Sequence, residues 1–192
     1  RGVEVKVIIK SKQALSQMLD ARAAELVGKK LEENGIELML GEEAVEIIGN
    51  GDVKAVKLDS GKVIGCSLVI VGKGVSPNTD LVKDTDIKVN EGILVNNLLQ
   101  TNLPDIYTAG DACESFDLTL GKTAVNALWP VAVEQGNLAG TNMAGGNVQY
   151  DGSLGMNSIE FFGLPVVSLG VYKTEAGVSL EDLKMQDSRA GI

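Results

Sequence analysis

The chain has 192 residues, of which 44% are hydrophobic and 22% charged, and a formal net charge of −9 at pH 7. This composition is ordinary for a soluble globular protein and excludes disorder, collagen or coiled coil as whole-chain descriptions. The excess of acidic residues argues against a nucleic-acid partner, because such proteins usually carry a basic face. Histidine is absent, so the chain supplies no histidine base, histidine metal ligand or Ser-His-Asp triad.

Cysteine usage and hydropathy bear on location and partners. Cys66 and Cys113 form no C-x-x-C pair or metal-ligand cluster, so no metal site is expected, and Cys113, close behind a Gly-Asp pair, is expected to be partly exposed. Two lone thiols favour a reducing, cytoplasmic location. No apolar stretch approaches the length of a membrane span, so no membrane partner is expected. The strand pattern begins directly at Arg1, which predicts a piece of a larger protein.

The first part of the chain predicts a parallel β-α-β unit. Residues 3–9 alternate and are β-branched, which is typical of a strand. Asp20 is the expected N-cap of a helix, Gly35 is expected just after that helix ends, and residues 36–40 are the next strand. Strand–helix–strand order is the pattern of a parallel sheet.

After residue 40 the sequence pattern changes to short strands separated by glycine-rich turns. Strands expected at residues 44–48, 53–58 and 62–64 predict a small antiparallel meander inserted in the parallel domain. Residues 67–71 are almost all apolar and predict a strand buried on both faces. A loop rich in glycine and proline follows at residues 72–78.

The remaining chain predicts shorter strands and two helices. Strands are expected at residues 93–95, 106–109, 158–162 and 166–171. Pro130 predicts the first turn of a helix over residues 130–144, which Gly145 ends. The polar tail from residue 174 contains one short helical pattern, at residues 180–185.

The segment from Thr101 to Asp111, TNLPDIYTAGD, carries the clearest chemical signal. A turn leads into a short strand that ends at Gly110, and the Asp111 carboxylate follows at once. Such a carboxylate can accept hydrogen bonds from a polyol, and the glycine lets a ligand approach the backbone closely. Open α/β sheets bind ligands at the carboxyl ends of their strands. The tripeptide Ala-Gly-Asp alone is more often a turn, in which Asp111 caps the next element.

The whole eleven-residue pattern resembles the second flavin-binding motif of the FAD-dependent pyridine nucleotide–disulfide oxidoreductase family. The resemblance implies that Gly110 and Asp111 bind FAD, with Asp111 on its ribityl chain. Residues 1–5 look like the second strand of that family's NAD-binding domain. Residues 68–79, which include Gly74, look like the segment that returns the chain to the FAD domain. The resemblance continues over residues 156–170, which are similar to the opening of the interface domain.

Residues 127–136 look like the start of the helix that lies beneath the flavin ring in this family. The resemblance implies that Leu128 and Trp129 lie near the ring; without it, Trp129 is more often a core anchor. The segment Leu128-Trp129-Pro130 resembles the corresponding segment of NADH oxidases, rubredoxin reductases and the flavin modules of nitrite reductases. A helix N-terminus aimed at the ring would stabilise negative charge on the reduced flavin.

The chain departs from the family in two places. It contains no G-x-G-x-x-G, of which the family uses two for the pyrophosphates of its dinucleotides. Where NAD-specific members carry an acid, this chain has Ile9, followed by Lys10 and Lys12. The two lysines would attract the 2′-phosphate of NADPH, or they are simply solvated loop charges.

Together these observations predict an α/β chain in three segments. A partial Rossmann-like NAD(P)-binding domain with an antiparallel β-meander is expected at residues 1–75, part of an FAD-binding domain at residues 76–146, and the start of an α+β interface domain at residues 147–192. The resemblance implies a fragment, without the amino-terminal half, of an enzyme that transfers hydride from NAD(P)H to FAD. A small-molecule or protein acceptor (oxygen, a disulfide, rubredoxin or nitrite) would take the electrons. A homo-oligomer is expected; the alternative is a non-catalytic nucleotide-binding or assembly module.

Overall fold

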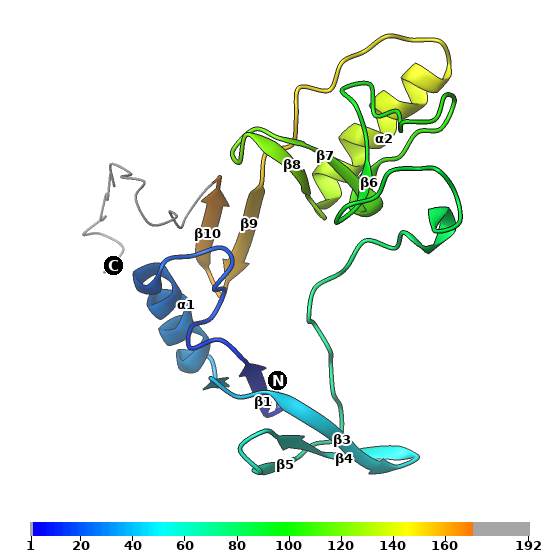
Figure 1. Cartoon of the computed structure of the whole chain (residues 1–192). Helices are drawn as coiled ribbons and strands as arrows, with labels where there is room; N and C mark the ends of the chain where they lie inside the picture. Colours follow the sequence, from blue (N-terminus) through cyan, green and yellow to red (C-terminus); the bar gives the residue numbers. More distant parts are fainter. Residues whose placement is uncertain (1, 171–192) are drawn as a thin grey trace, which may run out of the picture. The chain divides into compact units, whose positions relative to one another are not determined.

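A computed structural model describes residues 2–170 of the chain. These residues form two compact units: the first comprises residues 2–72 and 157–168, and the second residues 73–156 and 169–170. Both contain helices and strands (Figure 1), so the predicted α/β class is confirmed. Within residues 2–170, no helix is both long and apolar enough to cross a membrane. The helix predicted at residues 180–185 lies outside the described residues.

The first unit begins with the predicted strand–helix–strand order. Three elements follow one another: β1 (Val5–Ile9), α1 (Ala21–Glu33) and β2 (Ile36–Leu40). Strands β1 and β2 pair in parallel. The Asp20 carboxylate accepts a 2.8 Å hydrogen bond from the Ala23 backbone N–H, which confirms the predicted N-cap. Gly35 follows the helix with a φ of +79°, a left-handed conformation that favours glycine.

Helix α1 packs against a hairpin from much later in the sequence. The hairpin consists of β9 (Met156–Phe161) and β10 (Leu164–Leu169), strands predicted close to these positions. Ala24 and Val27 of α1 are buried, and Phe161, Leu164 and Val166 of the hairpin pack against them. The apolar face of α1 is therefore covered by residues that are distant in sequence.

The predicted antiparallel meander also forms within the first unit. It consists of β3 (Ala44–Asn50), β4 (Asp52–Leu58) and β5 (Val63–Gly65), with β4 in the middle. Val56 and Leu58 of β4 pack with Met39 of β2 in a buried cluster. This shared core joins the meander to the parallel strand pair.

The strand predicted at residues 67–71 does not form. Leu68 and Ile70 are 73% and 85% exposed, and only Val69 packs against the core of the meander. A strand needs a neighbour for its backbone hydrogen bonds, and none of the strands within residues 2–170 pairs with this segment. The prediction of a buried strand is therefore wrong, because an apolar run does not by itself supply a pairing partner.

The second unit is built around strand β7. Its elements are η1 (Asp80–Val82), β6 (Ile93–Leu94), η2 (Gly110–Ala112), β7 (Cys113–Asp117), β8 (Lys122–Val125) and α2 (Trp129–Met143). Strand β7 lies between β6, which is parallel to it, and β8, which is antiparallel. Leu99, Cys113, Ala139 and Tyr150 form a buried cluster. Helix α2 confirms the helix predicted from Pro130.

The strand predicted at residues 106–109 is reduced to a single bridge between Tyr107 and Gln100. The chain reverses direction just before it, where the Thr101 N–H donates a 2.8 Å hydrogen bond to the Ile106 carbonyl. The Thr108 N–H also donates to the Leu99 carbonyl at 3.1 Å, but the pairing does not continue beyond this single bridge, so the prediction of a strand is wrong here.

Cys113 is buried, contrary to the expectation of partial exposure. It is 1% exposed at the start of β7. Burial, and after it the charge of Glu114, raises the pKa of its thiol to about 12. The thiol therefore remains protonated at neutral pH and lacks the thiolate that redox chemistry requires.

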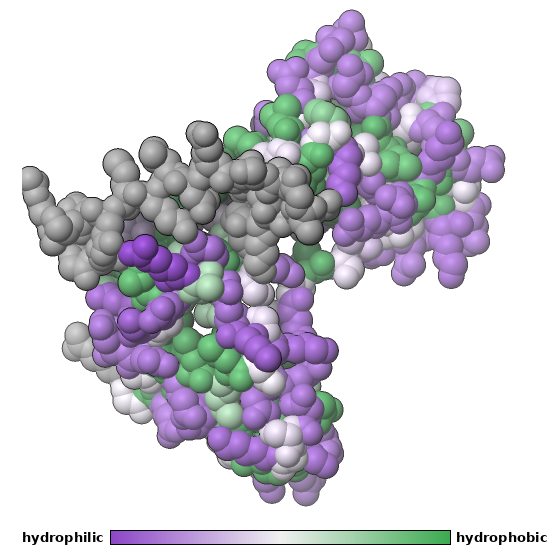
Figure 2. All heavy atoms as spheres, turned by 60° about the vertical axis from the view of Figure 1, so that its left-hand side comes forward, coloured by the Kyte–Doolittle hydropathy of each residue, from purple (hydrophilic) through white to green (hydrophobic). Residues whose placement is uncertain are grey.

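Both units keep large apolar side chains at the surface. Figure 2 shows apolar areas interspersed with hydrophilic ones on the visible face. In the meander, Val45, Ile47 and Val63 are more than half exposed. Between β7 and β8, Leu118 is 52% and Leu120 50% exposed. Exposed apolar surface of this kind favours association with another chain.

Candidate functional site

The Gly110–Asp111 turn packs against the first turns of α2. Gly110 has a φ of +76°, which side-chain-bearing residues rarely adopt. A Cβ at this position would also lie 3.2 Å from the Cβ of Ala132 on α2. Glycine is thus required here twice, by its conformation and by the close approach of the helix.

Asp111 is exposed directly after this glycine. No side chain caps the short helix η2, and among residues 2–170 the Asp111 carboxylate has no hydrogen-bond or ion-pair partner. Its oxygens are therefore directed to solvent and available to a ligand.

The N-terminus of α2 is open. Its N-cap residue is Leu128, no side chain caps it, and Pro130 lies in its first turn. The first intrahelical bond runs from the Ala132 N–H to the Leu128 carbonyl at 2.9 Å, so the earlier N–H groups have no helical acceptor. Trp129 is 82% exposed, which excludes the alternative that it anchors the core of this unit. The helix end thus offers N–H donors, partial positive charge and an exposed aromatic ring.

A buried glutamine, which the sequence analysis missed, joins these two features. Gln135 on α2 accepts a 2.8 Å hydrogen bond from the backbone N–H of Gly110. Val131, Gln135, Ala139 and Asn142 are the buried residues of α2, and they recur at helical spacing. That spacing is the sequence signal that could have placed Gln135 on the buried face of the helix. It was missed because glutamine is a polar residue that is common on helix surfaces.

Three other residues predicted for cofactor binding lie apart from this turn in the sequence. Ile9 ends β1, and its carbonyl accepts a 2.8 Å hydrogen bond from the Gly41 N–H. The Lys10 ammonium lies 2.7 Å from the Glu43 carboxylate, and this hydrogen bond raises the pKa of Lys10. Gly74 lies in an exposed loop of the second unit with a φ of +80°.

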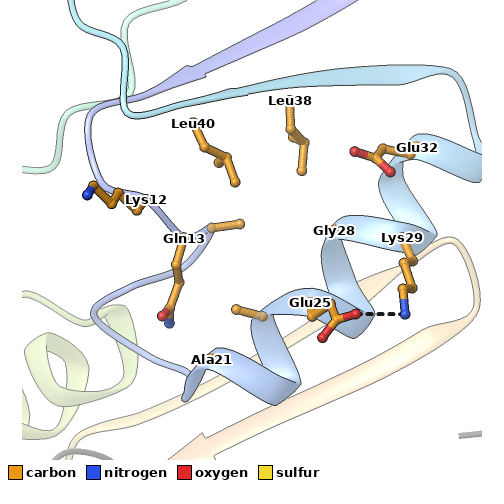
Figure 3. A pocket seen from close by; sticks show the side chains of 11 residues that line it. Lys12, Gln13, Ala21, Glu25, Gly28, Lys29, Glu32, Leu38 and Leu40 are labelled. Carbon is orange, nitrogen blue, oxygen red and sulfur yellow. Dashed lines mark ion pairs between the residues drawn. The ribbon is translucent and has the colours of Figure 1, made fainter.

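The first unit contains a pocket of about 460 Å³ between α1, β2 and residues 12–14 (Figure 3). Leu38 and Leu40 line its sheet side, and Lys12 lies at its edge. On α1, Lys29 and Glu25 form an ion pair of 2.8 Å. Lys12, one of the two lysines considered for the 2′-phosphate, is among the lining residues, whereas Ile9, Lys10 and Gly74 are not.

The α/β fold, the glycine turn, whose carboxylate has no partner among residues 2–170, and the open helix end agree with the class of protein that the family comparison shows. The chain belongs to the pyridine nucleotide-disulphide oxidoreductase family, whose family model matches residues 1–136. The resemblance predicted from the motifs is thereby confirmed.

Particular relatives cover most of this chain. An NADH oxidase of Methanocaldococcus jannaschii is 39% identical over 146 residues, which is 76% of this chain and 32% of the relative. An FAD-dependent pyridine nucleotide-disulphide oxidoreductase from Desulfovibrio vulgaris matches 84% of this chain and 41% of its own, with a TM-score of 0.79 and 30% identity. A water-forming NADH oxidase from Lactobacillus brevis, bound to NADH, matches 88% of this chain and 38% of its own, with a TM-score of 0.80 and 26% identity. The chain therefore spans well under half of each relative.

Proposed function

We propose that this chain supplies flavin-binding and nicotinamide-nucleotide-binding segments to an FAD-dependent NAD(P)H oxidoreductase. The observation that carries the proposal is the Gly110–Asp111 turn beside the open N-terminus of α2, where the Asp111 carboxylate has no partner within the described part of the chain. The similarity to an FAD-dependent enzyme and to an NADH-bound oxidase supports it. Bound FAD would accept hydride from NAD(P)H and pass electrons onward.

The residues of the second unit fit a flavin. The Asp111 carboxylate suits the hydroxyl groups of a ribityl chain, because a carboxylate only accepts hydrogen bonds when ionised and hydroxyls donate them. The glycine before it leaves the backbone accessible. Leu128 and Trp129, at the positive end of α2, suit the ring, since N–H donors and the helix dipole stabilise the negative charge of a reduced flavin.

The first unit is proposed to bind the nicotinamide nucleotide through the end of β1, at Ile9 and Lys10, and Gly74 is proposed to contact a cofactor. A hydrophobic residue at the end of β1 does not repel a 2′-phosphate as an acid would. Lys10 forms an ion pair with Glu43, whose negative charge would weaken the attraction of Lys10 for a phosphate. NADH and NADPH therefore both remain substrates in this proposal.

The three domains retain their predicted bounds, residues 1–75, 76–146 and 147–192, as part of the proposal. The proposal also includes a cytoplasmic location, a homo-oligomer and an electron acceptor that is a small molecule or another protein. The acceptor classes are oxygen, a disulfide, rubredoxin and nitrite.

The test uses the full-length gene product. We expect it to purify with FAD, visible in its absorption spectrum, and NADH or NADPH to bleach the flavin without oxygen. Adding each acceptor class in turn then identifies the one that restores the oxidised spectrum. A protein that binds FAD but is not reduced by either nucleotide would support the alternative of a non-catalytic module.

A further inference from the structure

A buried hydrogen-bond network surrounds the Gly110–Asp111 turn on the side that faces α2. Gln135 is 2% exposed, and its Oε1 accepts the Gly110 N–H at 2.8 Å. Its Nε2 donates to Ser115 Oγ at 3.0 Å and to the Tyr150 hydroxyl at 3.3 Å. The Ser153 hydroxyl completes the network, 2.9 Å from that of Tyr150 and 3.3 Å from that of Ser115.

The bond to the Gly110 N–H holds the Ala109–Gly110 peptide, one residue before Asp111. Glycine restricts its own backbone less than any other residue, so an external contact must select its conformation. Gln135 supplies that contact from a side chain whose two ends are both bonded, and among residues 2–170 no buried side-chain polar atom lacks a partner. A fully bonded buried network holds its members in one arrangement.

We propose that Gln135 is a positioning residue for the flavin. It lies on the same helix as Leu128 and Trp129, and it holds the Ala109–Gly110 peptide, one residue before Asp111. One helix therefore sets the spacing between the ribityl contact and the ring contacts. This inference rests on the proposed function and adds a residue that touches neither the flavin nor the substrate.

Three variants separate positioning from general stability. Gln135→Met keeps a buried side chain of similar length but removes both hydrogen-bonding ends. Tyr150→Phe removes a hydroxyl from the same network and leaves the bond to Gly110 intact, so it is the matched control. Gln135→Glu keeps an acceptor for the Gly110 N–H, and the hydroxyls of Ser115 and Tyr150 can rotate to donate to the second oxygen.

The measurements are FAD affinity by fluorescence titration, the absorption spectrum and midpoint potential of the bound flavin, and the melting temperature of each apoprotein. In the full-length protein, we expect Gln135→Met to weaken FAD binding about tenfold or more and to shift the flavin spectrum. Tyr150→Phe should lower the melting temperature but leave FAD affinity within about twofold of wild type. Gln135→Glu should recover most of the affinity.

Equal losses of affinity in Gln135→Met and Tyr150→Phe would overturn the inference, as would wild-type affinity and spectrum in Gln135→Met. If Gln135→Met does not fold, Gln135→Asn withdraws the amide by one carbon, and wild-type FAD binding in that variant overturns the inference equally. A wild-type protein that binds no FAD refutes both the proposed function and this inference. A wild-type protein that binds FAD, with Gln135 variants that do so equally well, refutes the inference alone.

Discussion

At the scale of single residues, strand β7 carries buried carboxylates that are fully hydrogen bonded. Glu114 is 1% exposed and accepts hydrogen bonds from the backbone of Glu91 and Gly92 and from the side chains of Asn90 and Thr123. Burial opposes its ionisation, but these hydrogen bonds outweigh burial and hold its pKa below the ordinary value. The acid thus fastens the turn before β6 to the centre of the sheet.

Replacement of this acid should have a pH-dependent cost. At neutral pH, Glu114→Gln should lower the free energy of unfolding by about 1–3 kcal/mol, because a charged acceptor is lost. The pKa of Glu114 is lowered in the folded state, so its contribution is complete above its unfolded pKa and is lost as the pH falls through the folded value. Urea unfolding at about pH 7 and about pH 3 should therefore show the difference shrinking in acid.

The control for that experiment is Glu134→Gln, which changes an exposed acid on α2. It should have little effect at either pH. A cost of Glu114→Gln that is the same in acid and at neutral pH would contradict the role given to its charge.

A second prediction concerns Asp111, whose carboxylate has no partner among residues 2–170. In the full-length protein, Asp111→Ala should cost about 1–3 kcal/mol of FAD binding and leave the apoprotein as stable as wild type, because no internal bond is lost. The measurements are flavin retained after dialysis and the melting temperature. Retention equal to wild type would mean that Asp111 is only a turn residue.

At the scale of elements, local signals predicted both described helices and most strands, but they missed β7 and β8. Asp20 and Pro130 mark helix starts because capping and proline geometry act within a single turn. Strands β7 and β8 were not predicted, because buried β7 residues such as Glu114 and Asp117 are polar and break the hydrophobic alternation. Their burial depends on hydrogen bonds from distant residues, which no local pattern reveals.

The contact between η2 and α2 yields a prediction at this scale. Gly110→Ala should destabilise the second unit by more than the roughly 1–2 kcal/mol of a left-handed alanine, since its Cβ also crowds Ala132. Gly121→Ala is the matched control: its φ is +64°, with open space around it. Chemical denaturation of both variants separates the two costs. Equal destabilisation of the two variants would show that α2 accommodates the added Cβ at position 110 without a further cost in stability.

At the scale of the whole molecule, the chain covers only part of its relatives and contains no G-x-G-x-x-G. We expect the 192-residue chain alone to bind FAD weakly, because it lacks the pyrophosphate contacts, each of about 1.5–3 kcal/mol. Its exposed apolar side chains should make it self-associate. Calorimetric titration with FAD and light scattering test both expectations. Submicromolar binding by a monomer would contradict them.

Nucleotide choice is also a property of the assembled enzyme. We expect NADPH to be used at least comparably with NADH, because the proposed site at the end of β1 has Ile9 in place of an acid, followed by two lysines, Lys10 and Lys12. Lys10→Ala should reduce kcat/KM for NADPH more than for NADH, and Lys29→Ala, on α1, should change neither selectively. A preference for NADH beyond about a hundredfold, or about 2.7 kcal/mol, would refute this expectation.

The sequence by itself determined the family, the α/β class, the helix boundaries and the candidate flavin residues. These depend on local geometry, such as a cap, a proline or a glycine before an acid, which a short motif records in full. Tertiary structure alone decided that residues 67–71 find no strand partner among residues 2–170, that Cys113 is buried and that Gln135 holds Gly110. Each of those outcomes depends on which distant groups supply or withhold a hydrogen bond or a covering surface, and such contacts exist only once the chain has folded.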